Sequence, residues 1–234
     1  MEQNGIRENL AKIRERIGHA ADRTGRRPDE VTLIAASKMH SAEAVREAFL
    51  AGVRHFGENR VQEWEGKRAG VGDLAAHWHL IGHLQSNKAT RAARLFHSVD
   101  SVDDFELARR LDRARADLTG EGNLRVLIEV RLAPEESKSG VGREALSEVA
   151  EKICGFHNLQ LAGLMCIPPP FEDAEKARPY FAELRRLREQ LEVRLGRRLP
   201  VLSMGMSHDF EVAIAEGATE IRVGTALFGE RIAA

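Results

Sequence analysis

Two kinds of segment alternate along the chain: amphipathic stretches of helical length and short apolar runs of strand length. Residues 6–24 carry isoleucine and leucine at three- and four-residue spacing, which predicts a helix with one apolar face. The run VTLIAAS at 31–37 follows and has the length of a strand. Residues 41–52 then predict a second helix, because Ser41 is a favourable N-cap and Gly52 a favourable end.

The same unit recurs to the end of the chain. Further strands are predicted at 53–58, 77–82, 96–100, 124–132, 159–167, 200–205 and within 220–229. The helices between them are predicted at 61–69, 86–95, 102–118, 143–156, 174–195 and 209–217. Eight apolar strands that alternate with helices are typical of a parallel sheet with both faces covered. The pattern predicts an α/β fold, a single (β/α)8 TIM-like barrel with an extra N-terminal helix, with an open doubly wound sheet as the alternative.

Composition adds limits to this picture. No linker interrupts the alternation, so residues 1–234 are expected to form one domain. Lys and Arg number 35 and Asp and Glu 36, a balance that argues against a nucleic-acid-binding protein. No apolar run reaches the length of a membrane span, and the charged N-terminus lacks a secretory signal. The two cysteines, Cys154 and Cys166, form no metal or redox motif, so we expect a cytoplasmic protein.

In a barrel of this kind, the loops that follow the strands form the functional face. The residues at the predicted strand ends are therefore the candidates for a site. They are Ser37, Lys38, Glu58, Asn59, Gly82, His83, Asp100, Ser137, Lys138, Met165, Gly205, Ser207, Arg222, Gly224 and Thr225.

Lys38 directly follows the first predicted strand and is the strongest candidate for covalent chemistry. Partial desolvation at a barrel mouth disfavours the ammonium form and frees an amine that can attack a carbonyl carbon. The alternative is a lysine that extends from the strand end to solvent. Position alone does not separate the two interpretations.

Two consecutive turns have the composition of a phosphate site. The segments 203–214 and 222–230 each pass from a strand into a turn with glycine and a hydroxyl residue, Ser207 or Thr225. Backbone amides in such turns bind phosphate, and the loops after the seventh and eighth strands are the usual place for it in these barrels. Either turn alone is more often an ordinary connection between a strand and a helix.

Two further features admit a functional or a structural interpretation. Arg222 lies within the last strand, where it either contacts a ligand or pairs with a residue such as Glu129 on another strand. His77 and His79 share one strand face, as in metal sites of some barrel hydrolases. The other candidate ligands are scattered, so we expect no metal and interpret His79 as part of an internal network.

The motifs together resemble one family. They are SKMHSAEAV, FGENRVQE, WHLIGHLQSNK, HSVD, ESKSGVG, LAGLMCIPP and LSMGMSHDFEVAIAEGATEIRVGTALFG, which lie between residues 31 and 229. They resemble the pyridoxal phosphate homeostasis proteins, small barrels similar to the N-terminal domain of alanine racemase. The resemblance implies that pyridoxal 5′-phosphate (PLP) is the cofactor and that Lys38 holds it as a Schiff base.

The resemblance also implies roles for other residues. Ser207, Gly224 and Thr225 would hold the 5′-phosphate, Arg222 would face the pyridine nitrogen, and Asn59 would line the pocket. One departure is Arg131, where the family pattern leads us to expect asparagine. The role of that position, like that of Lys138, stays open.

The implied function is cofactor homeostasis without substantial turnover, through buffering or delivery of PLP. An arginine at the pyridine nitrogen leaves that nitrogen unprotonated, which weakens the cofactor as an electron sink. The sole tyrosine, Tyr180, lies in a predicted outer helix, although racemases of this type use a tyrosine as the second acid. We expect PLP and apo PLP-dependent enzymes as partners and a monomer. The alternatives are a low-activity PLP-dependent amino-acid racemase and, more remotely, a metal-dependent hydrolase.

Overall fold

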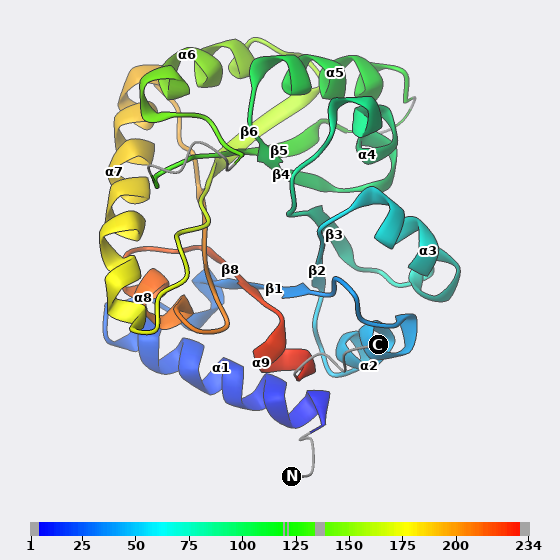
Figure 1. The fold of residues 1–234 in the computed structure, drawn as a ribbon, viewed down its shortest axis with the longest axis vertical. Coiled ribbons are helices and arrows are strands. Elements are labelled where there is room, and N and C mark those ends of the chain that lie inside the picture. The colour runs from blue at the N-terminus through cyan, green and yellow to red at the C-terminus, as the bar shows by residue number, and fades with distance from the viewer. Residues whose placement is uncertain (1–4, 119, 121, 134–138, 230–234) are drawn as a thin grey trace.

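The computed structural model describes residues 5–118, 120, 122–133 and 139–229. Eight parallel strands follow one another in chain order and close into a barrel, since β8 pairs with β1 (Figure 1). They are β1 (Thr32–Ala36), β2 (His55–Glu58), β3 (His77–Leu80), β4 (Ser98–Val102), β5 (Leu124–Glu129), β6 (Leu159–Met165), β7 (Val201–Met206) and β8 (Glu220–Val223). The predicted barrel is confirmed, and the doubly wound alternative is wrong because the sheet has no open edge.

Helices surround the barrel on its outer side (Figure 1). The α-helices are α1 (Ile6–Asp22), α2 (Ala42–Leu50), α3 (Val61–Val71), α4 (Ala89–Leu95), α5 (Phe105–Ala116), α6 (Arg143–Cys154), α7 (Arg178–Leu195), α8 (Phe210–Ala215) and α9 (Thr225–Phe228). Three short 3-10 helices are η1 (Pro28–Glu30), η2 (Ser86–Lys88) and η3 (Ala174–Ala177). The extra helix α1 packs against α8, α9 and α2. No helix in the described ranges is both long and apolar enough to cross a bilayer.

Some predicted boundaries were wrong. The fourth strand was predicted at 96–100 but covers Ser98–Val102, and the helix predicted at 102–118 begins only at Phe105. The reason is local capping: the Asp104 side chain accepts a hydrogen bond from the Leu107 amide over 2.6 Å, which fixes the helix start. The last strand, by contrast, lies within the predicted range 220–229, as Glu220–Val223, and the chain turns into α9 after Gly224.

The apolar core lies mainly between the strands and the helices. Phe56 and Trp78 stack there with ring centroids 5.2 Å apart, and both side chains are buried. Burial of one such side chain contributes on the order of 2 kcal/mol. Inside the barrel, by contrast, the apolar cluster is small and consists of Leu127, Ala162 and Met165. Barrel interiors of this class are usually filled by branched aliphatic layers, so this interior leaves room for polar groups.

Candidate functional site

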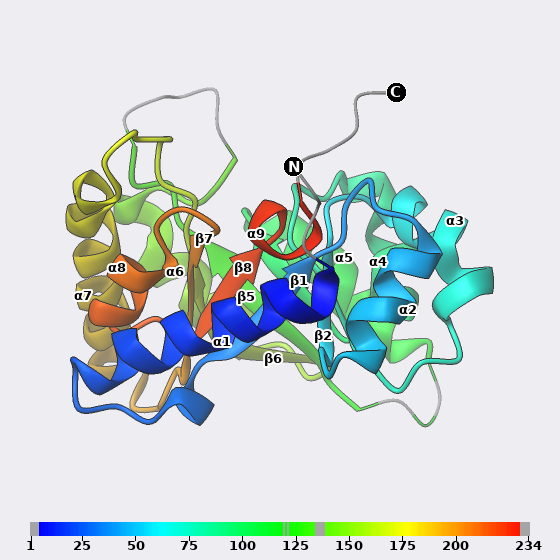
Figure 2. The same cartoon turned by 90° about the horizontal axis from the view of Figure 1, so that it is seen from below.

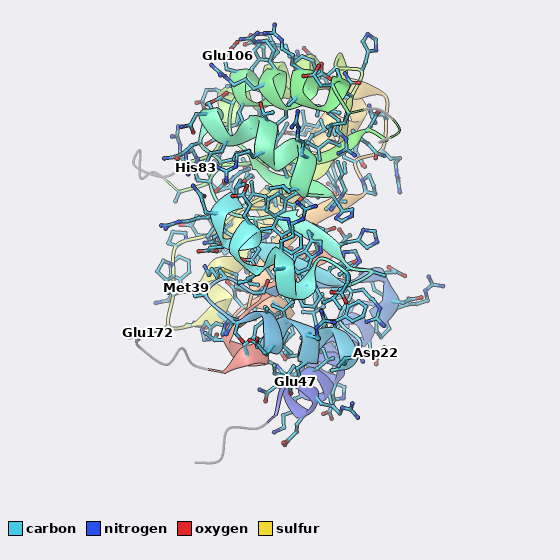
Figure 3. All side chains as sticks on the ribbon, turned by 90° about the vertical axis from the view of Figure 1, so that its right-hand side faces the viewer. Asp22, Met39, Glu47, His83, Glu106 and Glu172 are labelled. Carbon is cyan, nitrogen blue, oxygen red and sulfur yellow. The ribbon has the colours of Figure 1, made fainter. Side chains whose placement is uncertain are left out.

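The strand ends meet on one side of the molecule, and a cavity opens there. Figure 3 shows Met39, His83 and Glu172, which follow β1, β3 and β6, along the same side. The cavity has a volume of about 450 Å³. Its walls include Lys38, Asn59, Ser207, Arg222, Gly224 and Thr225, all six residues predicted to bind a cofactor. The structure thus brings together groups from β1, β2, β7 and β8.

A buried network of an ion pair and hydrogen bonds fixes the end of β1, directly before Lys38. The carboxylate of Glu58 accepts hydrogen bonds at Oε1 from Ser37 Oγ over 2.7 Å and from Lys67 Nζ over 2.8 Å. Lys67 also donates to the Ser37 carbonyl oxygen over 2.5 Å. Burial raises the pKa of Glu58, while the charge of Lys67 acts to lower it. This network ties β1 to β2 immediately before Lys38 and Asn59 and so positions both.

The turn after Lys38 has an unusual backbone. Met39 adopts φ 62°, a left-handed conformation that is uncommon for a residue with a Cβ atom, and its side chain is exposed. Such conformations cost of order 1–3 kcal/mol and persist where surrounding contacts determine them. Here the turn directs Lys38 toward the cavity while Met39 lies outside.

The two turns predicted to bind phosphate are joined to each other. The Ser207 hydroxyl oxygen accepts hydrogen bonds from the amides of Gly224 and Ala226 over 3.2 and 3.3 Å. The end of β7 is closely packed on α8, because Gly205 adopts φ 92° and an added Cβ would lie 2.6 Å from Ala213. In Figure 2 the short helix α9 lies at the carboxyl end of β8. The geometry therefore places one hydroxyl and several backbone amides on a common wall.

Arg222 is buried, and its partners differ from the ion pair that was considered. Nη1 donates to Ser203 Oγ and Nη2 donates to the Cys166 carbonyl oxygen, each over 2.8 Å. No ion pair joins Arg222 to Glu129 within the described part of the chain. The guanidinium is therefore held by neutral acceptors. Its positive charge lies in the cavity wall that also includes Lys38 and Glu129.

Glu129 is a cavity residue that sequence reasoning named only as a pairing partner. Burial raises its pKa, the charge of Asp103 raises it further, and Arg222 acts to lower it. Its two oxygens accept hydrogen bonds from the Ser139 hydroxyl over 3.3 and 3.4 Å. Alternation along β5 puts Glu129 on the inward face, a signal that could have identified it.

Other cavity residues were also missed, and several candidates lie elsewhere. His40, Ile81, Ile167, Met206 and His208 line the cavity besides the residues named above. Ser37, Glu58, Asp100 and Met165 are buried away from it, whereas Gly82 and His83 do line it. Ser137 and Lys138 lie outside the described residues.

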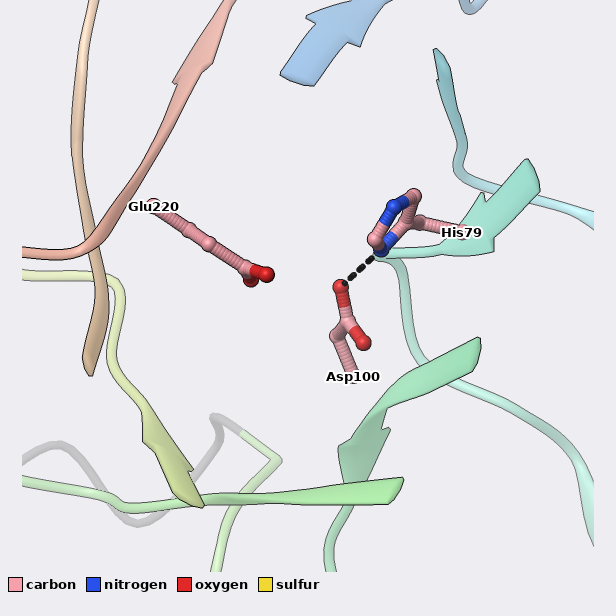
Figure 4. A group of neighbouring side chains, drawn as sticks. All are labelled: His79, Asp100 and Glu220. Atoms are coloured by element: carbon pink, nitrogen blue, oxygen red, sulfur yellow. Dashed lines mark hydrogen bonds and ion pairs between the residues drawn. The ribbon is translucent and has the colours of Figure 1, made fainter. Parts of the chain in front are cut away.

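A second polar group occupies the barrel interior (Figure 4). His79, Asp100 and Glu220 come from β3, β4 and β8, and one ligand atom of each lies within 4.8 Å of the others. His79 Nδ1 and Asp100 Oδ2 are 3.0 Å apart, and His79 Nε2 lies 3.0 Å from His55 Nδ1. Of the residues that a metal site could have used, His79 and Asp100 do meet here, whereas His208 and Asp209 take no part in the group.

Arg125 supplies the positive charge of this interior group. Its Nη2 donates to Glu220 Oε1 over 2.5 Å, and Nη1 lies 3.4 Å from His79 Nδ1 and 3.9 Å from Asp100. Burial acts to raise the pKa of Asp100, but His79 and Arg125 lower it overall. Burial and the nearby Asp100 raise the pKa of Glu220. Since a guanidinium lies among the three candidate ligands, the arrangement is a charge network, and the interpretation of His79 as a network residue is confirmed.

The cavity at the strand ends is therefore the candidate functional site. It offers an amine, a guanidinium, hydroxyls and backbone amides in one space of about 450 Å³. An amine can form a covalent bond with an aldehyde, and the amides and hydroxyls can bind a phosphate. A small phosphorylated aldehyde is the ligand class that matches this set.

Comparison with known proteins gives matches over nearly the whole chain. The family profile for the alanine racemase N-terminal domain matches residues 6–232. A pyridoxal phosphate homeostasis protein of Pseudomonas aeruginosa is 48% identical over 226 residues, which cover 97% of this chain and 96% of that protein. Proteins of the same name from Aquifex aeolicus and Escherichia coli are 44% and 42% identical, with coverage of at least 96% on both sides.

Solved structures agree with these relatives. PipY of Synechococcus elongatus is 42% identical in a structure with PLP bound, which superposes with a TM-score of 0.85 and covers 96% of this chain and all of that one. Its PLP-free structure gives a TM-score of 0.86 at 43% identity. Alanine racemase of Clostridium difficile shares the fold at 12% identity with a TM-score of 0.73, and the match covers 98% of this chain and 57% of that enzyme.

Proposed function

This chain belongs to the alanine racemase N-terminal domain family, as one of its pyridoxal phosphate homeostasis proteins, and from that premise we propose that it binds PLP at the cavity lined by Lys38. PLP supplies an aldehyde that reacts with amines, a phosphate dianion and a pyridine nitrogen. The single observation that carries the proposal is the convergence of Lys38, Ser207, Arg222 and Thr225 on one cavity.

The donor set fits each part of that cofactor. Lys38 provides the amine for the aldehyde, and Asn59 from the next strand lines the same space. Ser207 and Thr225 provide hydroxyl donors for the phosphate, and Gly224, whose amide donates to Ser207 Oγ, lines the same wall. The guanidinium of Arg222 carries only hydrogen-bond donors, so a pyridine nitrogen beside it would act as an acceptor. The cavity of about 450 Å³ has room for a ligand of this size.

The function is cofactor homeostasis and not catalysis of a reaction. The curated relatives are named for PLP homeostasis. The racemase alternative is not favoured, because the sole tyrosine, Tyr180, lies on the outer helix α7 beside Phe171, away from the cavity. Within homeostasis we propose that the chain stores PLP and passes it to apo-enzymes.

The remaining parts of the proposal concern the chain's setting. We propose a monomeric, single-domain carrier that spans residues 1–234; the closure of all eight strands into one barrel supports the single domain. Cys154 and Cys166 are both unpaired thiols, which supports a reducing compartment such as the cytoplasm.

The experiment that tests the proposal is a titration of the purified chain, freed of cofactor, with PLP. We expect saturable binding of one PLP per chain, with a visible absorption band that disappears after borohydride reduction. Pyridoxine 5′-phosphate, which lacks the aldehyde, should bind without that band. Failure of PLP to bind at micromolar concentration would contradict the proposal.

A further inference from the structure

A second cavity adjoins the one assigned to PLP. It has a volume of about 540 Å³ and shares His83, Glu129, Ser139 and Ile167 with the first cavity. The remaining walls come from the segment that continues β5, namely Val130, Arg131, Leu132 and Ala133. Since Lys38 and Ser207 line only the first cavity, PLP held by them would leave this second space for another ligand.

The chain beyond β5 is extended and held in place, so the direction of its side chains is defined. Arg131 N donates to the Val141 carbonyl oxygen over 3.0 Å, and Val141 N donates to the Glu129 carbonyl oxygen over 2.8 Å. In extended backbone, residues two apart point to the same side, with Cα atoms about 6–7 Å apart. Glu129 and Arg131 therefore both face the second cavity, as its lining shows.

These two side chains have opposite charges and different partners. Glu129 lies at the junction of the two cavities and accepts hydrogen bonds from the Ser139 hydroxyl. The side chain of Arg131 forms no ion pair and no hydrogen bond with any residue in the described ranges, and it is half-buried. A guanidinium in that position is a ready binding group for a carboxylate.

We propose that the second cavity binds an α-amino acid, with its amino group at Glu129 and its carboxylate at Arg131. The opposite charges on one strand face can pair with the ammonium and the carboxylate of such a molecule. Ala133 and Ile167 are apolar residues of the same lining and fit an aliphatic side chain. Ile167 is 43% exposed, and a bound side chain would cover it. The inference rests on the proposed function, because it places the amino group at the boundary of the PLP cavity.

A site of this kind would bring free amino acids into contact with the bound cofactor. Their amino groups would reach the space that Lys38 shares with Glu129, while the carboxylate selects α-amino acids over simple amines. Arg131 thereby acquires a role at a position where family resemblance leads one to expect asparagine. It is a specificity-determining residue for the ligand, through direct contact with the carboxylate.

The test uses two stable ligands that differ only in the carboxylate. They are N-(5′-phosphopyridoxyl)-L-leucine and N-(5′-phosphopyridoxyl)-3-methylbutylamine, and their dissociation constants are measured by calorimetry on the full chain freed of PLP. We expect the leucine compound to bind about tenfold more tightly, the effect of one partly exposed charged hydrogen bond. Arg131→Met should bring the ratio close to one and leave the affinity for the amine compound unchanged. Arg131→Lys should keep part of the preference.

An exposed arginine provides the matched control. Arg110→Met on α5 removes the same charge far from the cavity and should preserve the tenfold preference. Equal affinities for both ligands in the unaltered chain, or a preference that persists in Arg131→Met, would overturn the inference while the proposed function stands. If neither ligand binds, the PLP site itself is wrong, and both proposals fall.

Discussion

Arg222 donates a hydrogen bond of 2.8 Å from Nη2 to the carbonyl oxygen of Cys166, which ties the last strand to the end of β6 through the inside of the barrel. Nη1 is held in the same way by Ser203 on β7. The guanidinium is thus oriented by the protein before any ligand arrives. Pre-orientation of this kind lowers the entropic cost of binding.

The burial of Cys166 predicts a difference in reactivity between the two thiols. Cys166 is 1% exposed, and burial raises its pKa to about 12, whereas Cys154 is half-buried. Because the thiolate is the reactive form, an alkylating reagent at pH 8 should modify Cys154 in the folded chain and Cys166 only after unfolding. Peptide mass mapping after a time course measures both rates. Comparable rates in the folded chain would contradict the buried arrangement, and Cys154→Ser provides the control.

The phosphate wall predicts selective effects of two hydroxyl deletions. Ser207→Ala and Thr225→Ala each remove a donor to a charged group, which should weaken PLP binding by roughly ten- to a hundredfold. Ser207→Ala should have the larger effect, because Ser207 also holds the amides of Gly224 and Ala226. Dissociation constants for PLP, measured by calorimetry, check this.

Two controls separate phosphate binding from general damage. Pyridoxal lacks the phosphate, so its weaker binding should be the same in both variants and the parent. Thr90→Ala removes an exposed hydroxyl on α4 and should leave PLP binding unaltered. If both site variants bind PLP with the dissociation constant of the parent, the phosphate-binding site lies elsewhere.

Glu129 predicts a pH dependence of stability in the cofactor-free chain. Burial raises the pKa of Glu129 in the folded state above the ordinary value of 4.5. At a pH between the ordinary value and the folded-state pKa, the folded state therefore binds more protons than the unfolded state. The contribution of Glu129 to the free energy of unfolding is therefore full below about pH 4.5 and is lost as the pH rises through the folded pKa.

Urea unfolding across this range measures that slope. Glu129→Gln should make the slope shallower, because only the contributions of other buried carboxyls such as Glu58 and Glu220 remain. It should also increase stability at neutral pH, because the buried negative charge is gone. Glu148→Gln, an exposed position on α6 paired with Lys152, should leave the slope in place. An unchanged slope in Glu129→Gln would show that this carboxyl group ionises as it does in solvent.

The position of Tyr180 outside the cavity predicts negligible racemase activity. A positioned acid or base contributes roughly 10²–10⁴-fold to a rate, and Tyr180 lies on α7 with Phe171. Incubation with alanine and serine in D2O, followed by chiral analysis and mass spectrometry, should show no inversion near 1 s⁻¹. Inversion at such a rate would favour the racemase alternative and direct attention to His83 and His208 at the cavity.

The strand and helix order could be predicted because it depends on local patterns. Uninterrupted apolar runs, glycine stops and the cap at Ser41 are all visible along the chain, and Ser41 does accept a hydrogen bond from the Ala44 amide. Lys38, Ser207 and Thr225 followed from the rule that strand ends form the functional face. The sequence contained a cap at Asp104 as well, but the preceding strand was placed two residues early and concealed it.

The contacts inside the barrel could not be predicted in the same way. Which of Glu129, Arg125 and Arg222 meet depends on the stagger between strands as the sheet closes, and the pairing of β5 with β6 shifts between Val126 and Leu127. Arg222 therefore donates to neutral acceptors and Arg125 pairs with Glu220. The charges of these side chains would equally allow other ion pairs.

The central claim is that Lys38 holds PLP covalently, and one measurement tests it most directly. The chain is saturated with PLP, reduced with borohydride, digested and mapped by mass spectrometry. The account predicts one phosphopyridoxyl group per chain, located on Lys38, and no labelled peptide in Lys38→Ala, while Lys88→Ala at a neighbouring loop keeps the label on Lys38. A label on any other lysine, or a Lys38→Ala chain that still yields one full equivalent of adduct, would contradict it.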